Sequence, residues 1–238
     1  MEVQDITSTL AIVIPVYNEQ EIISYVIKSW IEECRQLCDD FAIIAVNDGS
    51  KDNSLEILNQ LSNIYKELIV CDQKNRGHGP AILTAYKNLN SKWIFQVDSD
   101  NEMSPKYFCK LWNQREQFDL LVAQRINRYQ SVSRQIITRL SRFTIGVFFG
   151  RDVIDVNSPY RLYRVTAFKE EFNKIPSETF APNLILSGCA SYKNLRVKNI
   201  DIPVQPRQTG EVSIKKWRAL RAAFKSWWQT LNFRMKYL

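Results

Sequence analysis

Histidine is almost absent from this chain of 238 residues, which contains only His78. A single histidine inside a glycine-rich turn argues against a zinc site and against a Ser-His-Asp hydrolase. The five cysteines are an odd number and do not have metal-ligand spacing. They indicate free thiols in a reducing compartment rather than a disulfide framework.

Long apolar runs are also missing. No stretch approaches the roughly 18 consecutive apolar residues of a membrane span, and the densest runs, residues 10–17 and 143–149, have the length of a strand or core helix. The first ten residues contain no basic segment followed by an apolar one, so we expect no secretion signal. These absences predict a cytoplasmic chain, and its length predicts one large domain or a domain with an appendage.

Acidic residues are nearly absent from the end of the chain. From residue 207 onward there are eight basic residues and one acidic residue, which accounts for the whole net charge of +7. We expect a domain over residues 1–210 and a basic amphipathic helix over residues 211–238. This helix either lies in a membrane interface or packs on the domain or a second subunit. Its apolar positions, at helical spacing, are Trp217, Leu220, Phe224, Trp227, Trp228 and Leu231.

In the first half of the chain, segments typical of strands alternate with segments typical of helices. This alternation predicts an α/β fold with a mostly parallel sheet. Asn18 and Glu21 have the spacing of a capping box for the first helix. Ligands of such sheets bind beyond the carboxyl ends of the strands. We expect strands at residues 10–16, 41–46, 68–71, 93–97 and 119–123, and helices at residues 19–38, 52–65, 80–89 and 105–117.

Special residues follow four of these strands. Tyr17 and Glu19 come after the first, Asp48 after the second, and a glycine-rich turn at residues 75–80 after the third. An acidic stretch follows the fourth. Because parallel strands end at one edge, we expect these residues to converge there.

The acidic stretch places Asp98, Asp100 and Glu102 at alternate positions after an apolar strand. Alternate side chains of an extended chain point the same way, so their repulsion would need a cation to offset it. Hard oxygen ligands suit Mg²⁺ or Mn²⁺. An isolated acidic pair would be read as a solvated turn, and the other motifs at the same edge favour the metal site.

Together these motifs resemble the family 2 glycosyltransferases of GT-A fold, and within them the polyprenyl-phosphate glycosyltransferases of the dolichol-phosphate mannose synthase type. The resemblance covers about residues 10–215. The family's Pro-x-Tyr-Asn-Glu, Asn-x-Gly-x-Gly-x-Ala and Asp-x-Asp motifs stand at residues 15–19, 75–81 and 98–100. Its Val-Asp-Asp-Gly-Ser motif stands as Val-Asn-Asp-Gly-Ser at 46–50, its Gly-x-Arg as Ala-Gln-Arg at 123–125, and its Asp-x-x-Ser-Gly-Phe-Arg-Leu as Asp-Val-Asn-Ser-Pro-Tyr-Arg-Leu at 155–162. A Pro-Arg-Gly-Ser segment follows at 203–213.

The resemblance implies a metal-dependent transfer with inversion from a UDP- or GDP-linked sugar to a polyprenyl phosphate. A Mg²⁺ or Mn²⁺ ion held by Asp98, Asp100 and Glu102 would stabilise the leaving diphosphate. The residues implied to hold the nucleotide are Pro15, Tyr17, Glu19, Val46, Asp48, Asp98 and Ser99.

Four arginines are candidates for phosphate recognition, because guanidinium binds phosphate in a bidentate manner. They are Arg125, Arg134, Arg161 and Arg207, of which Arg134 rests on the loosest alignment. A phosphate acceptor is already ionised near neutral pH and needs little help from a base. A hydroxyl acceptor would need a general base, for which Asp155 is the first candidate and Asp152 the second.

Three departures from the family pattern matter, and they involve four positions. Asn47 replaces the first acid of the Asp-Asp pair, and Glu102 stands where several relatives carry glutamine. Pro159 and Tyr160 replace Gly-Phe, which predicts a different acceptor side.

The leading hypothesis places this enzyme at the cytoplasmic, inner face of a membrane as a peripheral protein. One alternative keeps the chemistry but uses a saccharide or other hydroxyl acceptor. Another is a non-catalytic nucleotide-sugar-binding subunit, against which the intact Asp98 and Asp100 argue. A homo-oligomer or a membrane-protein partner remains open, and no reader motif supports nucleic-acid binding.

Overall fold

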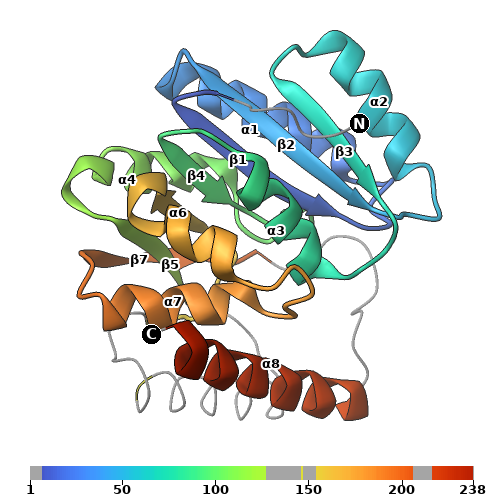
Figure 1. Cartoon of the computed structure of the whole chain (residues 1–238). Helices are drawn as coiled ribbons and strands as arrows, with labels where there is room; N and C mark the ends of the chain where they lie inside the picture. Colours follow the sequence, from blue (N-terminus) through green and yellow to red (C-terminus); the bar gives the residue numbers. More distant parts are fainter. Residues whose placement is uncertain (1–6, 127–145, 147–153, 206–215, 238) are drawn as a thin grey trace.

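The computed structural model describes residues 7–126, 146, 154–205 and 216–237 (Figure 1). Arg134, Asp152 and Arg207, like the apolar stretch at residues 131–149, lie outside the described residues apart from position 146.

Seven strands form one sheet in the order β3-β2-β1-β4-β6-β5-β7. Among these described strands only β6 is antiparallel to its neighbours. The predicted α/β fold with a mostly parallel sheet is therefore confirmed. The strands are β1 (Leu10–Val16), β2 (Phe41–Asp48), β3 (Leu68–Gln73), β4 (Trp93–Gln96), β5 (Leu120–Ile126), β6 (Arg161–Arg164) and β7 (Val197–Pro203).

Helices cover both faces of the sheet (Figure 1). One face carries α1 (Ile23–Leu37), α2 (Ser54–Ile64) and α4 (Phe108–Trp112), with the 3-10 turns η1 (Pro105–Tyr107) and η2 (Arg115–Gln117) beside α4. The other face carries α3 (His78–Asn88), α6 (Val165–Lys174) and α7 (Pro182–Tyr192), and α8 (Lys216–Tyr237) lies along α7.

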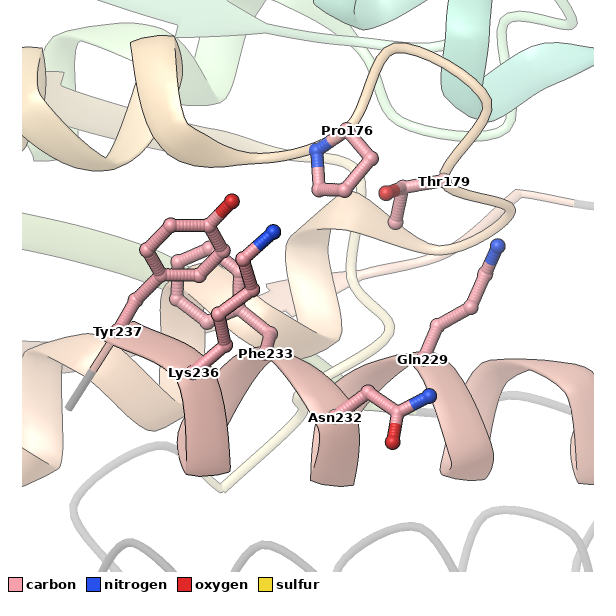
Figure 2. A pocket seen from close by; sticks show the side chains of 7 residues that line it. All are labelled: Pro176, Thr179, Gln229, Asn232, Phe233, Lys236 and Tyr237. Carbon is pink, nitrogen blue, oxygen red and sulfur yellow. The ribbon is translucent and has the colours of Figure 1, made fainter.

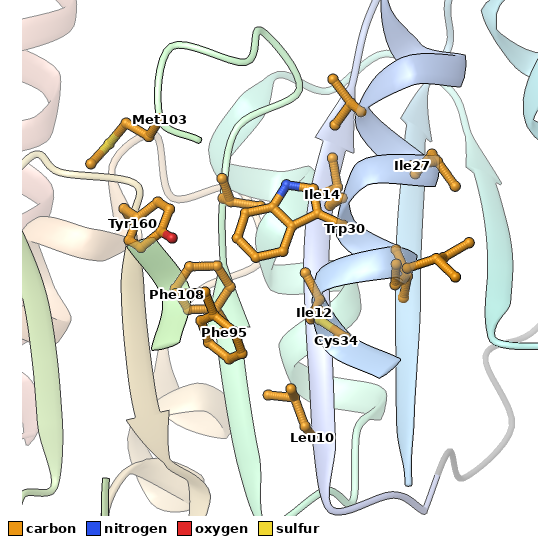
Figure 3. Packing of buried hydrophobic residues seen from close by; sticks show 14 of the residues in the cluster. Leu10, Ile12, Ile14, Ile27, Trp30, Cys34, Phe95, Met103, Phe108 and Tyr160 are labelled. Atoms are coloured by element: carbon orange, nitrogen blue, oxygen red, sulfur yellow. The ribbon is translucent and has the colours of Figure 1, made fainter. Parts of the chain in front are cut away.

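The central strands are apolar throughout because both of their faces are covered. Every residue of β1 is buried. Alternate side chains go to opposite faces, so Ile12 faces the α1 layer and Val13 the α3 layer. On the α1 side the aromatic rings of Trp30 and Phe95 lie 5.2 Å apart, with Phe108 and Tyr160 packed beside them (Figure 3). This aromatic cluster fixes β4 beneath the edge that carries the acidic stretch.

Two expectations about helix boundaries are wrong. The first helix begins at Ile23, without a side-chain cap. Asn18 has a left-handed backbone, with φ of 55°, and its side chain accepts a hydrogen bond from the backbone of Lys51 instead. The expected helix at residues 105–117 is broken into η1, α4 and η2, and the Arg115 guanidinium donates to the Trp112 carbonyl at its break.

The C-terminal helix packs on the domain through small and aromatic side chains. Within residues 224–237 its buried positions are Ser226, Thr230 and Phe233, and Phe233 joins the apolar cluster of the α3 layer. A shallow groove lies between α8 and the loop after α6 (Figure 2). None of the helices that the structure describes is both long and apolar enough to cross a bilayer.

Candidate active site

The carboxyl ends of β1 to β4 lie at one edge of the sheet, as their parallel register requires. Pro15 of β1 and Val46 of β2 are register partners there, and both are buried. The loop after β1 is joined to the loop after β2, because the backbone of Glu19 donates to Oγ of Ser54 at 2.8 Å. Glu19 is thereby buried, while the ring of Tyr17 is 40% exposed at the same edge.

Asp48 organises the glycine-rich turn that follows β3. Its Oδ2 accepts the backbone N–H of Gly77 at 2.7 Å, and its Oδ1 accepts that of Arg76 at 2.9 Å. The side chain of Gln73 donates a further bond to Oδ1 at 2.7 Å. A buried carboxyl group that accepts several hydrogen bonds holds its donors in place. Asp48 therefore fixes the turn over the end of β2.

The other side of the turn is fixed by a loop that sequence reasoning did not single out. A methyl group added at Gly79 would lie 2.2 Å from the carbonyl oxygen of Thr179 and 2.4 Å from that of Phe180. The Arg76 guanidinium pairs with the Glu178 carboxylate, with Nε at 3.0 Å from Oε1. Because these partners are about 100 residues apart in the sequence, no local pattern could have identified them.

The Asn47 departure has a structural reason. Asn47 is directly opposite Asp72 in the β2–β3 register, and its side-chain amide donates to Oδ1 of Asp72 at 2.6 Å. An aspartate at position 47 would place two carboxylates opposite each other. The asparagine turns this repulsion into a hydrogen bond.

The acidic stretch does not continue as an extended chain, so the expected alternation of its side chains is wrong. β4 ends at Gln96, and Asn101 has a left-handed backbone with φ of 54°. Oδ1 of Asp100 accepts the backbone N–H of Glu102 at 3.1 Å, which closes a turn. Among the described residues no group of three His, Cys, Asp or Glu side chains is arranged to hold a cation.

Asp98 nevertheless retains one feature of a cation ligand. Its Oδ1 is buried and accepts no hydrogen bond, although Nε2 of His78 lies 3.5 Å away. A buried anionic oxygen without a hydrogen-bond donor is costly unless a cation comes to it. The oxygen chemistry of this turn therefore fits Mg²⁺ or Mn²⁺. Ser99, between the two aspartates, is buried.

Tyr160, the second residue of the Pro159-Tyr160 departure, belongs to the core. Its ring is fully buried against Phe95, with centroids 4.7 Å apart. Its hydroxyl donates to the carbonyl of Ser104 at 3.2 Å, which a phenylalanine could not do. The tyrosine thus links the start of β6 to the segment that follows the acidic turn.

Arg125 and Asp155 form a bidentate ion pair, with distances of 2.7 and 2.9 Å. Burial alone would raise the pKa of Asp155, but hydrogen bonds from Arg125 and the charges of Arg125 and Arg161 outweigh it, so the pKa is lowered from 3.8. A carboxylate held ionised in this way is a weak base. The geometry therefore argues against Asp155 as the general base.

Arg161 lies in the core rather than at the surface of the site. Its side chain is fully buried, and Nε donates to the carbonyl of Ser158 at 2.7 Å. The remaining nitrogens donate to the carbonyls of Val156 and Asn183 and to the hydroxyls of Tyr163 and Ser187. The expectation that Arg161 meets a phosphate does not fit this geometry, because its donors are already used to fix the turn before β6.

Comparison with known proteins places this chain among glycosyltransferase sequences. Residues 11–172 match Glycosyl transferase family 2. The undecaprenyl-phosphate 4-deoxy-4-formamido-L-arabinose transferase of Photorhabdus laumondii is 28% identical over 205 residues, which are 85% of this chain and 62% of that protein. The protein of the same name from Yersinia enterocolitica is 30% identical over 178 residues, 74% of this chain and 54% of that one. The chain thus spans less than two thirds of these relatives.

Solved structures of low sequence identity share the fold. Glucosyl-3-phosphoglycerate synthase from Mycobacterium tuberculosis, in complex with Mn²⁺, UDP and phosphoglyceric acid, aligns with a TM-score of 0.68 and 15% identity, over 95% of this chain and 78% of that one. TarS from S. aureus in complex with UDP aligns with a TM-score of 0.55 and 21% identity, over 83% and 61%. The predicted GT-A fold is confirmed. Since the family match covers more than half of its length, this chain belongs to glycosyltransferase family 2.

Proposed function

We propose that this chain is an inverting glycosyltransferase that moves a sugar from a nucleotide diphosphate sugar to a polyprenyl phosphate. The observation that carries the proposal is the convergence at one sheet edge of Tyr17, the turn held by Asp48, and Asp98, whose buried oxygen accepts no hydrogen bond. Sequence relatives named as undecaprenyl-phosphate sugar transferases support the choice of acceptor.

The donor nucleotide, UDP- or GDP-linked, would lie across the ends of β1, β2 and β4. The nucleotide would contact the buried residues Pro15, Val46 and Glu19 at this edge. The ring of Tyr17, which is 40% exposed, would stack on the base. Gly77, which faces open space, leaves room for close approach of a ligand to the backbone of the turn. Asp48 would act mainly by holding that turn.

Asp98 and Asp100, with Glu102 beside them, would hold a Mg²⁺ or Mn²⁺ ion together with oxygens of the donor diphosphate. When bound, the ion would neutralise the charge that develops on the leaving diphosphate. Binding would also bring a cation to Oδ1 of Asp98, which accepts no hydrogen bond and has only Nε2 of His78 near it, at 3.5 Å, among the described residues.

The arginines would divide between two tasks. Arg125 would keep the Asp155 carboxylate ionised and in place, and Arg161 would fix the turn before β6. Phosphate recognition would then fall to Arg134 and Arg207, which the family motifs suggest. Each would stabilise the diphosphate or the acceptor phosphate through charge-assisted hydrogen bonds.

A phosphate acceptor suits the lowered pKa of Asp155. The oxygen of a lipid monophosphate is anionic near neutral pH and can attack the anomeric carbon without a base. A hydroxyl acceptor would need a base with a pKa near the working pH, and Asp155 lacks that property. This argument favours the phosphate acceptor over the hydroxyl alternative.

Because a polyprenyl phosphate resides in a bilayer, the proposed reaction takes place at a membrane surface. We place it at the cytoplasmic face, where nucleotide sugars are made, with the protein attached peripherally. A second copy of this chain or a membrane protein would be compatible with this arrangement.

The test measures release of nucleoside diphosphate from a panel of UDP- and GDP-sugars, with Mg²⁺ or Mn²⁺, with and without a short-chain polyprenyl phosphate. We expect release that requires both the metal and the lipid phosphate. Release that is stimulated only by a saccharide would move the acceptor to a hydroxyl. A donor that binds but is never turned over would contradict the enzymatic proposal.

A further inference from the structure

The helix α8 has two opposite faces of different character. Ser226, Thr230 and Phe233 are buried against the domain. At about 100° per residue, a second set of side chains falls on the opposite side, within an arc of about 60°. We call this set the outer stripe, and its members are Phe224, Trp228, Leu231 and Met235.

The outer stripe is exposed although it is apolar. Phe224 is 66% exposed, Trp228 51% and Met235 70%, while Leu231 is half-buried. Three large apolar side chains on one helix face, none of them used in the packing of the domain, indicate an interaction surface rather than scattered surface residues.

Positive charge borders the outer stripe on both sides. Lys225 and Lys236 lie on one flank, and Arg234, whose guanidinium is 5.1 Å from the ring centre of Tyr192, lies on the other. Over its whole length α8 has six basic and no acidic residues. Apolar side chains in the centre and cations at the margins match the boundary between acyl chains and anionic headgroups.

We propose that the outer stripe of α8 docks on an anionic bilayer, with its long axis in the plane of the membrane surface. This inference rests on the proposed lipid acceptor and deepens it by naming the surface that meets the lipid. A second copy of this chain fits the stripe less well, because a symmetric contact would bring the basic flanks of both helices together.

The experiment measures sedimentation of the full chain with phosphatidylcholine vesicles, with and without phosphatidylglycerol. The test variant is Phe224→Ser with Trp228→Ser. The matched control is Tyr25→Ser with Ile64→Ser, which removes side chains that are 59% and 70% exposed on α1 and α2. We expect binding that requires phosphatidylglycerol, weakens with salt, falls roughly tenfold or more in the test variant and is unchanged in the control.

Equal losses in both variants, or no binding by the wild-type chain, would overturn the docking surface. So would a test variant that loses self-association in light scattering while its vesicle binding is unchanged, since the stripe would then belong to a second copy. Binding of UDP and GDP with Mn²⁺ is measured on the same samples without vesicles. Its failure in a chain that still binds vesicles would contradict the proposed function and leave the docking surface standing.

A separate observation concerns the inner side of α8. The side chain of Gln229 extends from α8 toward the loop after α6 (Figure 2). Its Oε1 accepts the backbone N–H of Phe180 at 2.9 Å, and its Nε2 donates to the carbonyl of Glu178 at 3.3 Å. One amide thus fixes the loop that presses on Gly79 and pairs with Arg76.

This loop is the outer support of the glycine-rich turn, whose inner support is Asp48. We infer that Gln229 is a positioning residue for the donor site: it acts through the loop and touches no substrate. Removing both of its hydrogen bonds frees the loop from α8 and weakens the outer support of the turn, while Asp48 still holds the inner side.

The test compares Gln229→Leu and Gln229→Glu with Asn232→Leu, a neighbouring substitution on an exposed position of α8. We expect Gln229→Leu to raise the KM for the nucleotide sugar severalfold, with kcat at saturation little changed. Gln229→Glu keeps the acceptor for Phe180 and should recover part of the effect. A KM that rises equally in Asn232→Leu, or in none of the variants, would overturn the assignment, and wild-type protein that binds no nucleotide would instead contradict the proposed function.

Discussion

The side-chain amide of Asn47 lies 2.6 Å from the carboxylate of Asp72, directly across the β2–β3 register. Asn47 is almost completely buried while Asp72 is exposed, so this hydrogen bond is partly buried at the edge where Asp48 holds the glycine-rich turn. The pair explains why an amide is found at the first position of the acidic motif: its neighbour already supplies the carboxylate.

Replacing Asn47 by Asp should destabilise the protein at neutral pH by about 1–3 kcal/mol, because a hydrogen bond becomes a repulsion between two carboxylates. Urea unfolding measures the change. The double variant Asn47→Asp with Asp72→Asn restores one amide and one carboxylate and should recover most of the loss. A double variant as unstable as the two single changes added together would show that the pair is not coupled.

Replacing Asp98 by Asn should abolish metal-dependent turnover, with a loss in kcat of roughly a hundredfold or more. Thermal unfolding should change little or even improve, because the buried Oδ1 of Asp98 has no hydrogen bond to lose. Steady-state kinetics with Mg²⁺ and Mn²⁺ provide the measurement. Full turnover in the Asp98→Asn variant would remove this residue from the proposed metal site.

The Arg125–Asp155 pair should contribute stability that depends on pH in a defined direction. The folded pKa of Asp155 is lowered below 3.8, so its contribution is fully present above the unfolded pKa and is lost as the pH falls through the folded value. We expect the wild-type protein to be more stable than Asp155→Asn by about 3 kcal/mol between pH 5 and 7. The difference should shrink below about pH 4, and a difference that grows on acidification would have the wrong sign.

Arg161→Met should cost about 3–5 kcal/mol, because it removes donors from several buried oxygens at once. Urea unfolding of the purified variant measures this. Arg196→Met, which removes a guanidinium from an exposed pair with Asp119, serves as the control and should lose much less. A small loss at Arg161 would return this residue to the candidates for phosphate binding.

Gly79→Ala should destabilise the protein by about 1–3 kcal/mol, because the new methyl group meets backbone oxygens that cannot rotate away. Gly77→Ala meets nothing within 4 Å but has a φ of 99°, so its cost comes from backbone strain alone. Thermal unfolding gives both costs. A donor affinity that falls only in Gly79→Ala would connect the loop at residues 176–181 to the nucleotide site.

The sequence was sufficient for the architecture because the signals for β1, β2 and the glycine-rich turn are local. Apolar runs of strand length and the residues that end them lie within a few positions of each other. The capping box failed for the opposite reason: Asn18 has its partner at Lys51, which only the folded chain brings near. The four residues of a capping box cannot show that a distant backbone N–H will take the Asn18 side chain as its acceptor.

The acidic stretch and α8 show a second limit. Alternation predicts a common direction for Asp98, Asp100 and Glu102 only while the chain is extended, and β4 ends before the first of them. For α8 the apolar face was identified, but the domain contact is made by Ser226, Thr230 and Phe233. Small side chains allow close approach to α7, an advantage that no hydrophobicity pattern registers.

The reversed direction of β6 has a consequence for how this fold diversifies. Because β6 runs against its neighbours, it starts at the edge where β5 ends, and the chain leaves and rejoins the sheet on the same side. Changes in the length of the sequence between Ile126 and Arg161 therefore shift no strand register. Substitutions and insertions in that connection can therefore accumulate while the ends of β1, β2, β3 and β4 keep their places.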